Sequence, residues 1–169
     1  RGNEGAMVRW GLVPHWARDP SIGAKMNNAR AETVAEKPSF RDAYRKRRCL
    51  IPASGFYEWK LESGHRQPYY IHPSSGELFS FAGLWESWNG PTAPLETCAI
   101  ITTDANARMA AVHERMPVIV SPADYSAWLA GGEIPLRACA DSAIEVRRVS
   151  RAVNNARNDT PGLIEAENS

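Results

Sequence analysis

The stretch Cys49-Leu-Ile-Pro-Ala-Ser-Gly-Phe-Tyr-Glu-Trp-Lys60 decides the fold of this sequence. It begins with a short apolar run that ends at a Ser-Gly turn signal, and a second segment rich in aromatic residues follows. Apolar and aromatic runs bounded by Gly and Pro are typical of paired strands, so the stretch predicts a hairpin. The second strand of this hairpin would carry one acid, Glu58, among three aromatic side chains.

Two interpretations of Glu58 follow from this stretch alone. In the first, the carboxyl is buried on its strand; burial disfavours the charged form and raises the pKa, so the group can act as a general acid near neutral pH. In the second, Glu58 faces solvent or pairs with an arginine, because perturbed acids also occur in purely structural ion pairs. Without further context, the second interpretation is favoured.

The length and composition are those of a globular protein. With 169 residues, 43% hydrophobic and 23% charged, the chain can bury a core, and we expect one domain spanning residues 1–169. A net charge of +1 excludes a nucleic-acid polycation, although five basic residues cluster between Arg41 and Arg48, as on a solvated helix face. The sequence contains no apolar run that could span a bilayer and does not begin with a charged-then-apolar leader, so we expect no membrane association and a cytoplasmic location.

The three cysteines indicate reduced thiols. Cys49, Cys98 and Cys139 are far apart, and neither they nor the four histidines have the spacing of a zinc site. Cys49 and Cys98 lie in apolar, strand-like runs and are predicted to be inert core residues. We therefore expect no metal ion and no cofactor.

The remaining sequence alternates many short strands with a few short helices. Strands are predicted at residues 7–14, 69–72, 78–85, 97–103, 116–120 and 144–149. Helices are predicted at 38–48, with Phe40 and Tyr44 as inner contacts, at 104–114, at 121–131, and more weakly at 136–143. With no internal repeat and no linker, this order indicates the α+β class.

Three stretches are polar where their neighbours are apolar: residues 28–33, Glu58, and residues 113–115. Together they offer an acid, an imidazole and an amide for proton transfer, with two arginines available to hold an anion. His113 directly follows a predicted helix, whose C-terminus favours a charged imidazole, although taken singly His113 is better explained as structural. The residues alone thus indicate an acid–His–Asn site, without a nucleophile and without a Gly-rich phosphate loop.

Five motifs, in one order along the chain, resemble the SRAP family, the SOS-response-associated peptidases. The motifs occupy Arg9–Trp16, Asn28–Thr33, Arg48–Trp59, His113–Pro117 and Val153–Asp159. The resemblance implies a single SRAP-type α+β domain with a strand-rich, barrel-like core and a groove for single-stranded DNA. It also implies a role in the DNA damage response, as a covalent sensor and shield of abasic sites.

The chemistry that the resemblance implies needs a Cys at the mature N-terminus. Family members expose this Cys by removing the initiator Met, an autopeptidase activity, and it condenses with the aldehyde of an abasic site to a thiazolidine. Only a residue with both a free α-amine and a thiol can close that ring. This sequence begins at Arg1 and its three cysteines are internal. We therefore expect that the N-terminal segment of the family, with its first strands, is missing, and that the chain as it stands does not crosslink.

By motif, the resemblance implies three catalytic residues, Asn28, Glu58 and His113. Asn28 would hydrogen-bond near the terminal amine and the sugar. Glu58 would be the acid and base in sugar ring opening, imine formation and reversal. His113 would protonate or orient a hydroxyl or phosphate of the opened sugar. With the family in view, the general-acid interpretation of Glu58 becomes the favoured one.

The resemblance also implies contacts with DNA. Arg30 and Arg115 would grip the phosphates beside the lesion, and Trp16 would support an unstacked base, whereas Trp10 is expected in the core. The basic run from Arg41 to Arg48 is either a DNA-binding flank or a solvated face. The expected partner is single-stranded DNA with abasic sites, bound by a monomeric, nucleoid-associated protein.

Two other functions stay open. The first is a noncovalent single-stranded-DNA binding module, which would follow if the native N-terminus has no Cys. The second is a peptidase that acts in trans on other proteins, which the family name suggests, although no residues in the sequence specify a substrate groove.

Overall fold

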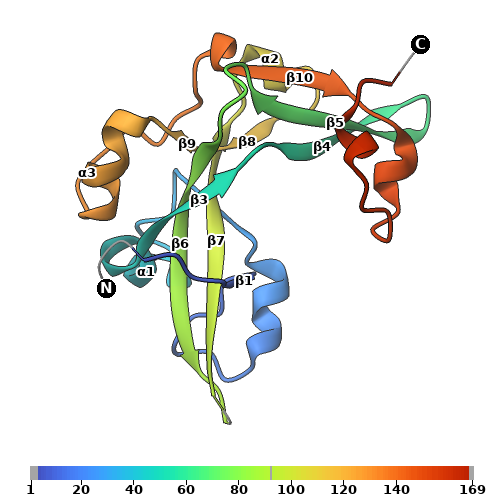
Figure 1. Cartoon of the computed structure of the whole chain (residues 1–169). Coiled ribbons are helices and arrows are strands. Elements are labelled where there is room, and N and C mark those ends of the chain that lie inside the picture. The colour runs from blue at the N-terminus through green and yellow to red at the C-terminus, as the bar shows by residue number, and fades with distance from the viewer. Residues whose placement is uncertain (1–3, 92, 168–169) are drawn as a thin grey trace. The chain divides into compact units, whose positions relative to one another are not determined.

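The computed structural model describes residues 4–91 and 93–167, and strands dominate it (Figure 1). Within the described residues they form two sheets. The larger sheet has seven strands in the order β1-β7-β6-β3, with β2 and β8 also paired to β7 and β9 paired to β6. The smaller sheet has the order β10-β5-β4 and is antiparallel. The strands are β1 Arg9–Trp10, β2 Asn28–Arg30, β3 Arg48–Ala53, β4 Phe56–Glu62, β5 His65–Pro73, β6 Phe79–Asn89, β7 Pro94–Asp104, β8 Arg115–Pro117, β9 Ile119–Val120 and β10 Ile144–Arg148.

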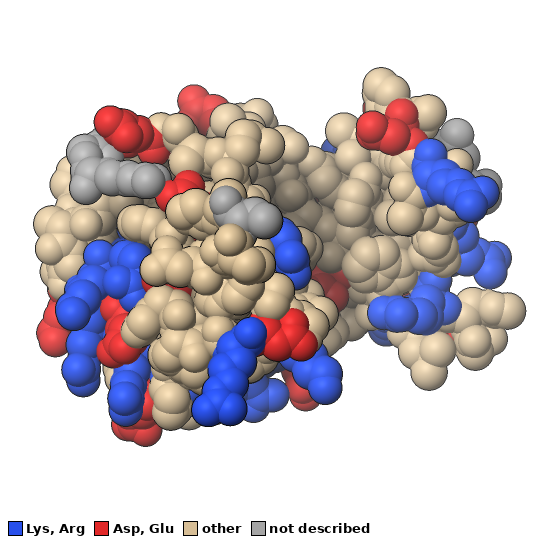
Figure 2. All heavy atoms as spheres, turned by 90° about the horizontal axis from the view of Figure 1, so that it is seen from below, with Lys and Arg blue, Asp and Glu red and all other residues tan. Residues whose placement is uncertain are grey.

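The helices are short, as the strand-rich α+β prediction requires, and that fold class is confirmed. They comprise α1 Arg41–Lys46, α2 Ala107–Ala110 and α3 Tyr125–Leu129, with the 3₁₀ turns η1 Pro20–Lys25, η2 Pro122–Asp124, η3 Asp141–Ala143, η4 Arg151–Asn154 and η5 Pro161–Ile164. Charged side chains of both signs are interspersed on the face shown in Figure 2, in keeping with the small net charge of +1.

Contacts gather the described residues into two compact units. The first unit holds those of Arg1–Ile51, Phe81–Thr103 and Pro117–Arg137, and the second holds those of Pro52–Ser80, Asp104–Met116 and Ala138–Ser169. The expectation of one domain over residues 1–169 stays a prediction.

The core of the first unit lies on β6 and β7. Leu84, Ala99 and Ile101 are fully buried there, and Phe40 and Tyr44 pack against the same cluster from the segment around α1. Phe40 and Tyr44 were predicted as the inner contacts of this helix, and that prediction is confirmed. The helix itself begins only at Arg41, three residues later than predicted, because residues 38–40 form a turn.

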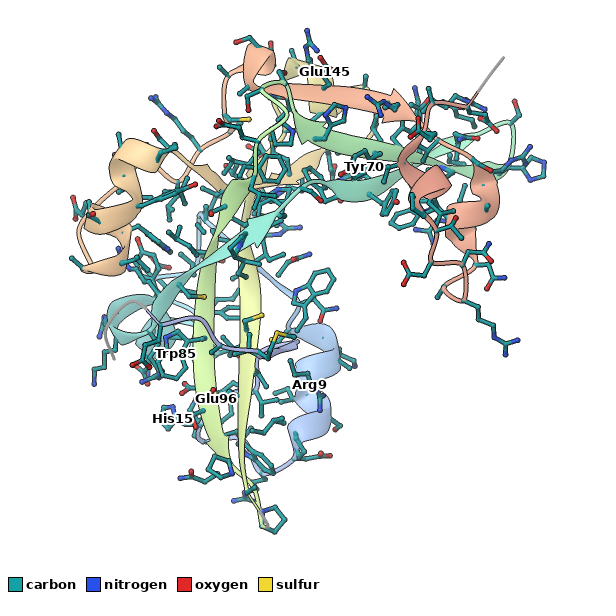
Figure 3. All side chains as sticks on the ribbon, in the orientation of Figure 1. Arg9, His15, Tyr70, Trp85, Glu96 and Glu145 are labelled. Carbon is teal, nitrogen blue, oxygen red and sulfur yellow. The ribbon has the colours of Figure 1, made fainter. Side chains whose placement is uncertain are left out.

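The predicted hairpin at Cys49–Lys60 is wrong in its pairing. The two strands exist, but β3 pairs with β6 whereas β4 pairs with β5. The reason is the Ser54–Gly55 corner: the ring of Tyr70, on β5 (Figure 3), packs directly on Gly55, and its hydroxyl donates to the Ser54 carbonyl at 3.0 Å. The turn signal was therefore correct, but the corner sends the chain into a different sheet.

Two of the predicted helices, at 104–114 and 136–143, are much shorter in the structure than the sequence predicted. The 104–114 segment contains only α2, which Asn106 caps by accepting a hydrogen bond from the Met109 N–H at 2.9 Å. The weak helix at 136–143 reduces to the single turn η3. The helix at 121–131 is confirmed as η2 followed by α3, and it ends before Gly131, whose φ is +83°.

Strand predictions succeeded best in the long apolar runs. Those at 69–72, 78–85, 97–103 and 144–149 correspond to β5, β6, β7 and β10, the first three of which extend further than predicted. The 116–120 run divides into β8 and β9, and the 7–14 run yields only β1. Trp10 was expected in the core, and this is wrong: it is 58% exposed, and its indole N–H donates to the Asn27 carbonyl at 2.9 Å.

Two of the basic residues between Arg41 and Arg48 have structural partners. Arg47 Nη2 lies 2.6 Å from a carboxylate oxygen of the buried Glu86, which His15 also contacts at 3.1 Å. The Arg48 guanidinium stacks over the rings of Tyr44 and Trp128. These two side chains are therefore not part of a freely solvated face, and the DNA-binding flank stays a prediction.

The core prediction is confirmed for Cys98, which is buried, whereas Cys49 is half-buried. Burial raises the pKa of Cys49 to about 12 and also raises the pKa of Cys98. Because the thiolate is the reactive form, these shifts disfavour either side chain as a nucleophile at neutral pH.

Candidate functional site

Glu58 and His113, two of the three predicted catalytic residues, both lie in the second unit. Glu58 is in the middle of β4, opposite Tyr69 of β5 and between Tyr57 and Trp59. The two strands are joined by a tight turn in which Ser63 and Gly64 have φ values of 47° and 81°. The in-register ladder from Phe56 to Glu62 fixes the position of the Glu58 backbone.

The Glu58 carboxyl is in the environment that the general-acid interpretation requires. Burial raises its pKa above the usual value for Glu, and three groups oppose this effect. In order of importance they are the imidazole of His113, the backbone N–H of Trp59 and the guanidinium of Arg66. Glu58 is thus a partly buried acid on which the imidazole of His113 acts.

His113 is oriented by the main chain two residues further on. Its Nδ1 lies 3.0 Å from the Arg115 backbone N and 3.1 Å from the Arg115 carbonyl oxygen. A neutral ring accepts from the fixed N–H donor through Nδ1, which leaves its proton on Nε2. A charged ring instead donates from Nδ1 to the carbonyl, so the short loop between α2 and β8 supports either protonation state.

The backbone of His113 ends a helical turn. Its N–H donates to the Met109 carbonyl at 2.9 Å, so the residue is at the C-terminal end of the α2 turn, as the sequence predicted. This main-chain hydrogen bond fixes His113 at the end of the α2 turn.

Arg115, predicted to grip a phosphate, already holds an acid. Its Nη1 donates to Oδ1 of Asp104 at 2.6 Å, and the Arg115 side chain is only 16% exposed whereas that of Asp104 is 87% exposed. A guanidinium has five N–H donors, so one carboxylate does not exhaust it. Asp104 therefore orients the Arg115 guanidinium. Both residues belong to the same unit as His113.

The other three predicted residues belong to the first unit. Asn28 and Arg30 lie on β2, which pairs in parallel with β7. Ala29 between them is fully buried, so the alternation of a strand places both exposed side chains on the opposite face. Trp16 is 50% exposed and lines a surface pocket of about 320 Å³ with Ile22 and Lys25.

Sequence reasoning missed two residues near Glu58. Arg66 of β5 lies over the Trp59 ring, 5.7 Å from its centre, and is the last of the groups that lower the pKa of Glu58; Asn154 of η4 accepts a hydrogen bond from the Trp59 indole N–H. The Val153–Asp159 motif drew attention to the segment that contains Asn154, but the motif alone assigned no role to that residue. No sequence pattern pointed to Arg66, because its position depends on the β4–β5 register.

Over residues 4–91 and 93–167, no group of three or more His, Cys, Asp or Glu side chains is placed to hold a metal ion. No helix within that part of the chain is long and apolar enough to cross a membrane.

The fold and the motifs together define an SRAP-type protein. Residues 1–156 match the family model described as SOS response associated peptidase (SRAP), and the chain belongs to this family. It is 46% identical over 168 residues to the abasic site processing protein YoqW of Bacillus subtilis, covering 94% of this chain and 75% of that protein. It is 32% identical over 190 residues to the abasic site processing protein HMCES of Xenopus tropicalis, covering 95% and 57%.

Solved structures agree with this assignment. A crystal structure of a protein from Bacteroides thetaiotaomicron superposes with a TM-score of 0.85 at 30% identity, covering 94% of this chain and 75% of the other. A second, from Bordetella bronchiseptica, gives a TM-score of 0.76 at 26% identity, covering 86% and 77%. The family predicted from five sequence motifs is confirmed.

Proposed function

We propose that this protein processes abasic sites in single-stranded DNA by forming a covalent crosslink through an N-terminal Cys. The names of its relatives support abasic sites as the substrate class. The observation that carries the proposal is the partly buried Glu58 carboxyl, with its raised pKa, beside His113. A group of this kind can be protonated when the sugar needs an acid and ionised when it needs a base.

The proposed reaction consumes one aldehyde and one aminothiol and releases one water. As the ring opens, the bond between C1 and the ring oxygen breaks, Glu58 donates its proton to that oxygen, and the C1 hydroxyl gives its proton back to the Glu58 carboxylate as the aldehyde forms. The N-terminal amine adds to the aldehyde carbon, and the carbinolamine loses water to form an imine, with Glu58 again supplying and recovering the proton. The thiolate then adds to the imine carbon, the nitrogen takes up a proton, and the thiazolidine closes.

His113 has the supporting role in this scheme. With Nδ1 accepting from the Arg115 N–H, its Nε2–H is the donor that would hold a hydroxyl or phosphate oxygen of the opened sugar. The positive charge that it can acquire also lowers the pKa of Glu58 and makes that acid a better proton donor. The two residues would thus act as a coupled pair.

Contacts with the DNA strand form the second part of the proposal. Arg30 and Arg115 would hold phosphates, and Asn28, on the same face of β2 as Arg30, would hydrogen-bond to the terminal amine and the sugar. The exposed Trp16 would carry an unstacked base, a contact that tolerates any sequence and contributes about 1–3 kcal/mol per base. Binding would then weaken with salt in proportion to the phosphates held.

The proposed reaction requires a Cys with a free α-amine at the N-terminus, so the test must establish which residue is there. The three cysteines of the 169-residue sequence are internal and have no free amine. We propose that the crosslinking Cys is exposed by self-cleavage of the initiator Met, in agreement with the family description as a peptidase.

The experiment uses the natural protein, with its N-terminus determined by mass spectrometry. The protein is incubated with a single strand carrying one abasic site and, in parallel, with the undamaged strand, and both are run on a denaturing gel. The expected result is a shifted band with the damaged strand alone, with a mass equal to protein plus DNA minus one water. A protein with a verified N-terminal Cys that gives no band would overturn the covalent proposal and leave the noncovalent DNA-binding module.

A further inference from the structure

Trp16, the residue proposed to carry a base, lies in a tight turn between β1 and η1. The Ala17 N–H donates to the Pro14 carbonyl at 2.9 Å, which closes a turn with His15 and Trp16 at its two central positions. The Trp16 side chain is half-exposed. Two side-chain contacts, which we call the tethers, join this turn to β6, and they involve the residues on either side of Trp16.

The first tether is the side chain of His15, labelled beside β6 in Figure 3. Its Nδ1 lies 3.1 Å from Oε2 of Glu86 on β6. An ionised carboxylate only accepts hydrogen bonds, so Nδ1 is the donor. The same Oε2 accepts from Arg47 Nη2 at 2.6 Å, and Oε1 accepts from the Ser87 N–H at 3.1 Å. Because the Glu86 side chain is only 5% exposed and is held by these other donors, it offers His15 a fixed acceptor.

The second tether acts on the other side of Trp16. The Trp88 indole N–H donates to the Ala17 carbonyl at 2.7 Å. Trp88 and Glu86 are two residues apart on β6, so their side chains leave the same face of the strand. At both positions β6 is paired in register with β7. One paired strand therefore holds the residue before Trp16 and the residue after it.

The surface pocket of about 320 Å³ at Trp16 has a second wall, which is also fixed. This wall is η1, which supplies Ile22 and Lys25 to the pocket. Gly23 in the same turn packs so closely on the main chain near β1 that a Cβ there would lie 2.6 Å from the Gly11 carbonyl oxygen. Both walls of the pocket are thus anchored to the rest of the first unit.

We propose that His15 and Trp88 are positioning residues for Trp16: they hold the Pro14–Ala17 turn on β6 and so present the Trp16 ring in one orientation to an unstacked base. The use of the ring for a base rests on the proposed function, whereas the tethers are a property of the first unit. Neither His15 nor Trp88 has to contact the DNA strand.

The physical gain is in conformational entropy. A ring on an untethered turn has to be ordered when a base stacks on it, and this ordering costs free energy at the moment of binding. With the tethers in place, the cost is already met when the first unit folds. Losing a tether should therefore weaken stacking on Trp16 without removing the ring itself.

The test is binding of the natural protein to an undamaged oligo(dT) strand, measured by fluorescence anisotropy of a label on the DNA. Trp16→Ala should weaken binding about 5- to 150-fold, the factor that corresponds to about 1–3 kcal/mol of stacking. His15→Ala and Trp88→Phe, which keeps a ring but no N–H, should each weaken binding by a smaller factor. In the Trp16→Ala background neither should weaken it further, because a positioning residue acts only through the ring that it holds.

Two control variants separate positioning from other effects. His15→Asn places an amide nitrogen where Nδ1 was and should bind like the wild type. His65→Ala removes another exposed imidazole, from the second unit, and should leave binding unchanged. An equal loss for His15→Ala with and without the Trp16 ring would overturn the proposal, since His15 would then act on the strand directly. Wild-type binding by both tether variants would also overturn it, and if one of them does not fold, the other is judged by the same criterion.

A second measurement, without DNA, separates failure of the tethers from failure of the proposed function. The protein is labelled with 5-fluorotryptophan, and the fluorine NMR resonance of Trp16 is assigned by its loss in Trp16→Phe. In His15→Ala this resonance should move toward its position in the urea-unfolded protein, and in His65→Ala it should stay. A wild type that does not bind oligo(dT), with a Trp16 resonance that depends on the tethers, would refute the proposed DNA contacts alone. A Trp16 resonance that neither tether variant moves would refute the positioning role alone.

Discussion

Replacing Gly55 by Ala tests the corner that separates β3 from β4. A Cβ at this position would lie less than 3.0 Å from three atoms of the Tyr70 ring, closer than real Cβ contacts. Gly55 is not among the glycines with positive φ, so the penalty comes from the ring and not from the backbone. Tyr70 is only 7% exposed and its hydroxyl is bound to the Ser54 carbonyl, so it cannot simply swing away.

Overpacking of this kind costs about 1–3 kcal/mol. For a chain of this length each kcal/mol lowers the melting temperature by about 2–4 °C, so the expected decrease is roughly 2–12 °C. The assay is thermal unfolding of four proteins: wild type, Gly55→Ala, Tyr70→Ala and the double variant. With the ring removed, Gly55→Ala should cost nothing further and can stabilise by about 0.4–1 kcal/mol through the unfolded state.

Gly162→Ala serves as the control, because nothing lies within 4 Å of a Cβ at Gly162. It should be neutral or slightly stabilising. An equal loss for Gly55→Ala with and without the Tyr70 ring would show that the corner is not set by this contact, and would refute the explanation of why the two strands separate.

Two further predictions concern charge. Arg47→Met should cost about 3 kcal/mol in the free energy of unfolding, because it removes the guanidinium from the buried Glu86 carboxylate and leaves it with the half-exposed His15 and the Ser87 backbone N–H. Arg41→Met, at 3.9 Å from an exposed acid, should cost less than about 1 kcal/mol, and equal losses in urea unfolding would contradict this. Because burial raises the Glu58 pKa, this carboxyl binds more proton in the folded chain than in the unfolded one above the unfolded value of about 4.3, and its contribution to stability falls as pH rises through its folded pKa. Glu58→Gln should therefore melt higher than wild type at pH 7 and equally near pH 3, and a lower melting temperature at pH 7 would refute the reasoning.

The sequence allowed prediction of the elements whose signals are local. The apolar runs that became β6 and β7 needed only their own composition, and the Ser-Pro-Ala-Asp start of the η2–α3 segment carries its own cap signal. The partner of β3 could not be predicted in this way. It depends on a ring packed at Gly55 from a residue fifteen positions later, and no local pattern reports such a contact.

The candidate site shows the same division. Motifs identified Glu58 and His113, and the structure puts His113 close enough to influence the Glu58 carboxyl. The contact of Arg66 with the Trp59 ring depends on the β4–β5 register, and that of Asn154 with the same indole on the docking of η4, so neither follows from spacing. Trp10 was misassigned to the core: its side chain is exposed and its indole N–H is bound to the Asn27 main-chain carbonyl, a contact that local composition does not report.

The central claim is that Glu58 is the acid and base of abasic-site chemistry. The most direct measurement is the single-turnover rate of crosslink formation and of reversal, in the natural protein with a verified N-terminus, for wild type, Glu58→Gln and Glu77→Gln. Glu77, in the turn before β6, is exposed and serves as the control for loss of one negative charge. Glu58→Gln should slow formation and reversal by about 10²-fold or more, the usual contribution of a general acid–base residue, whereas Glu77→Gln should match the wild type. Unchanged rates for Glu58→Gln would contradict the account.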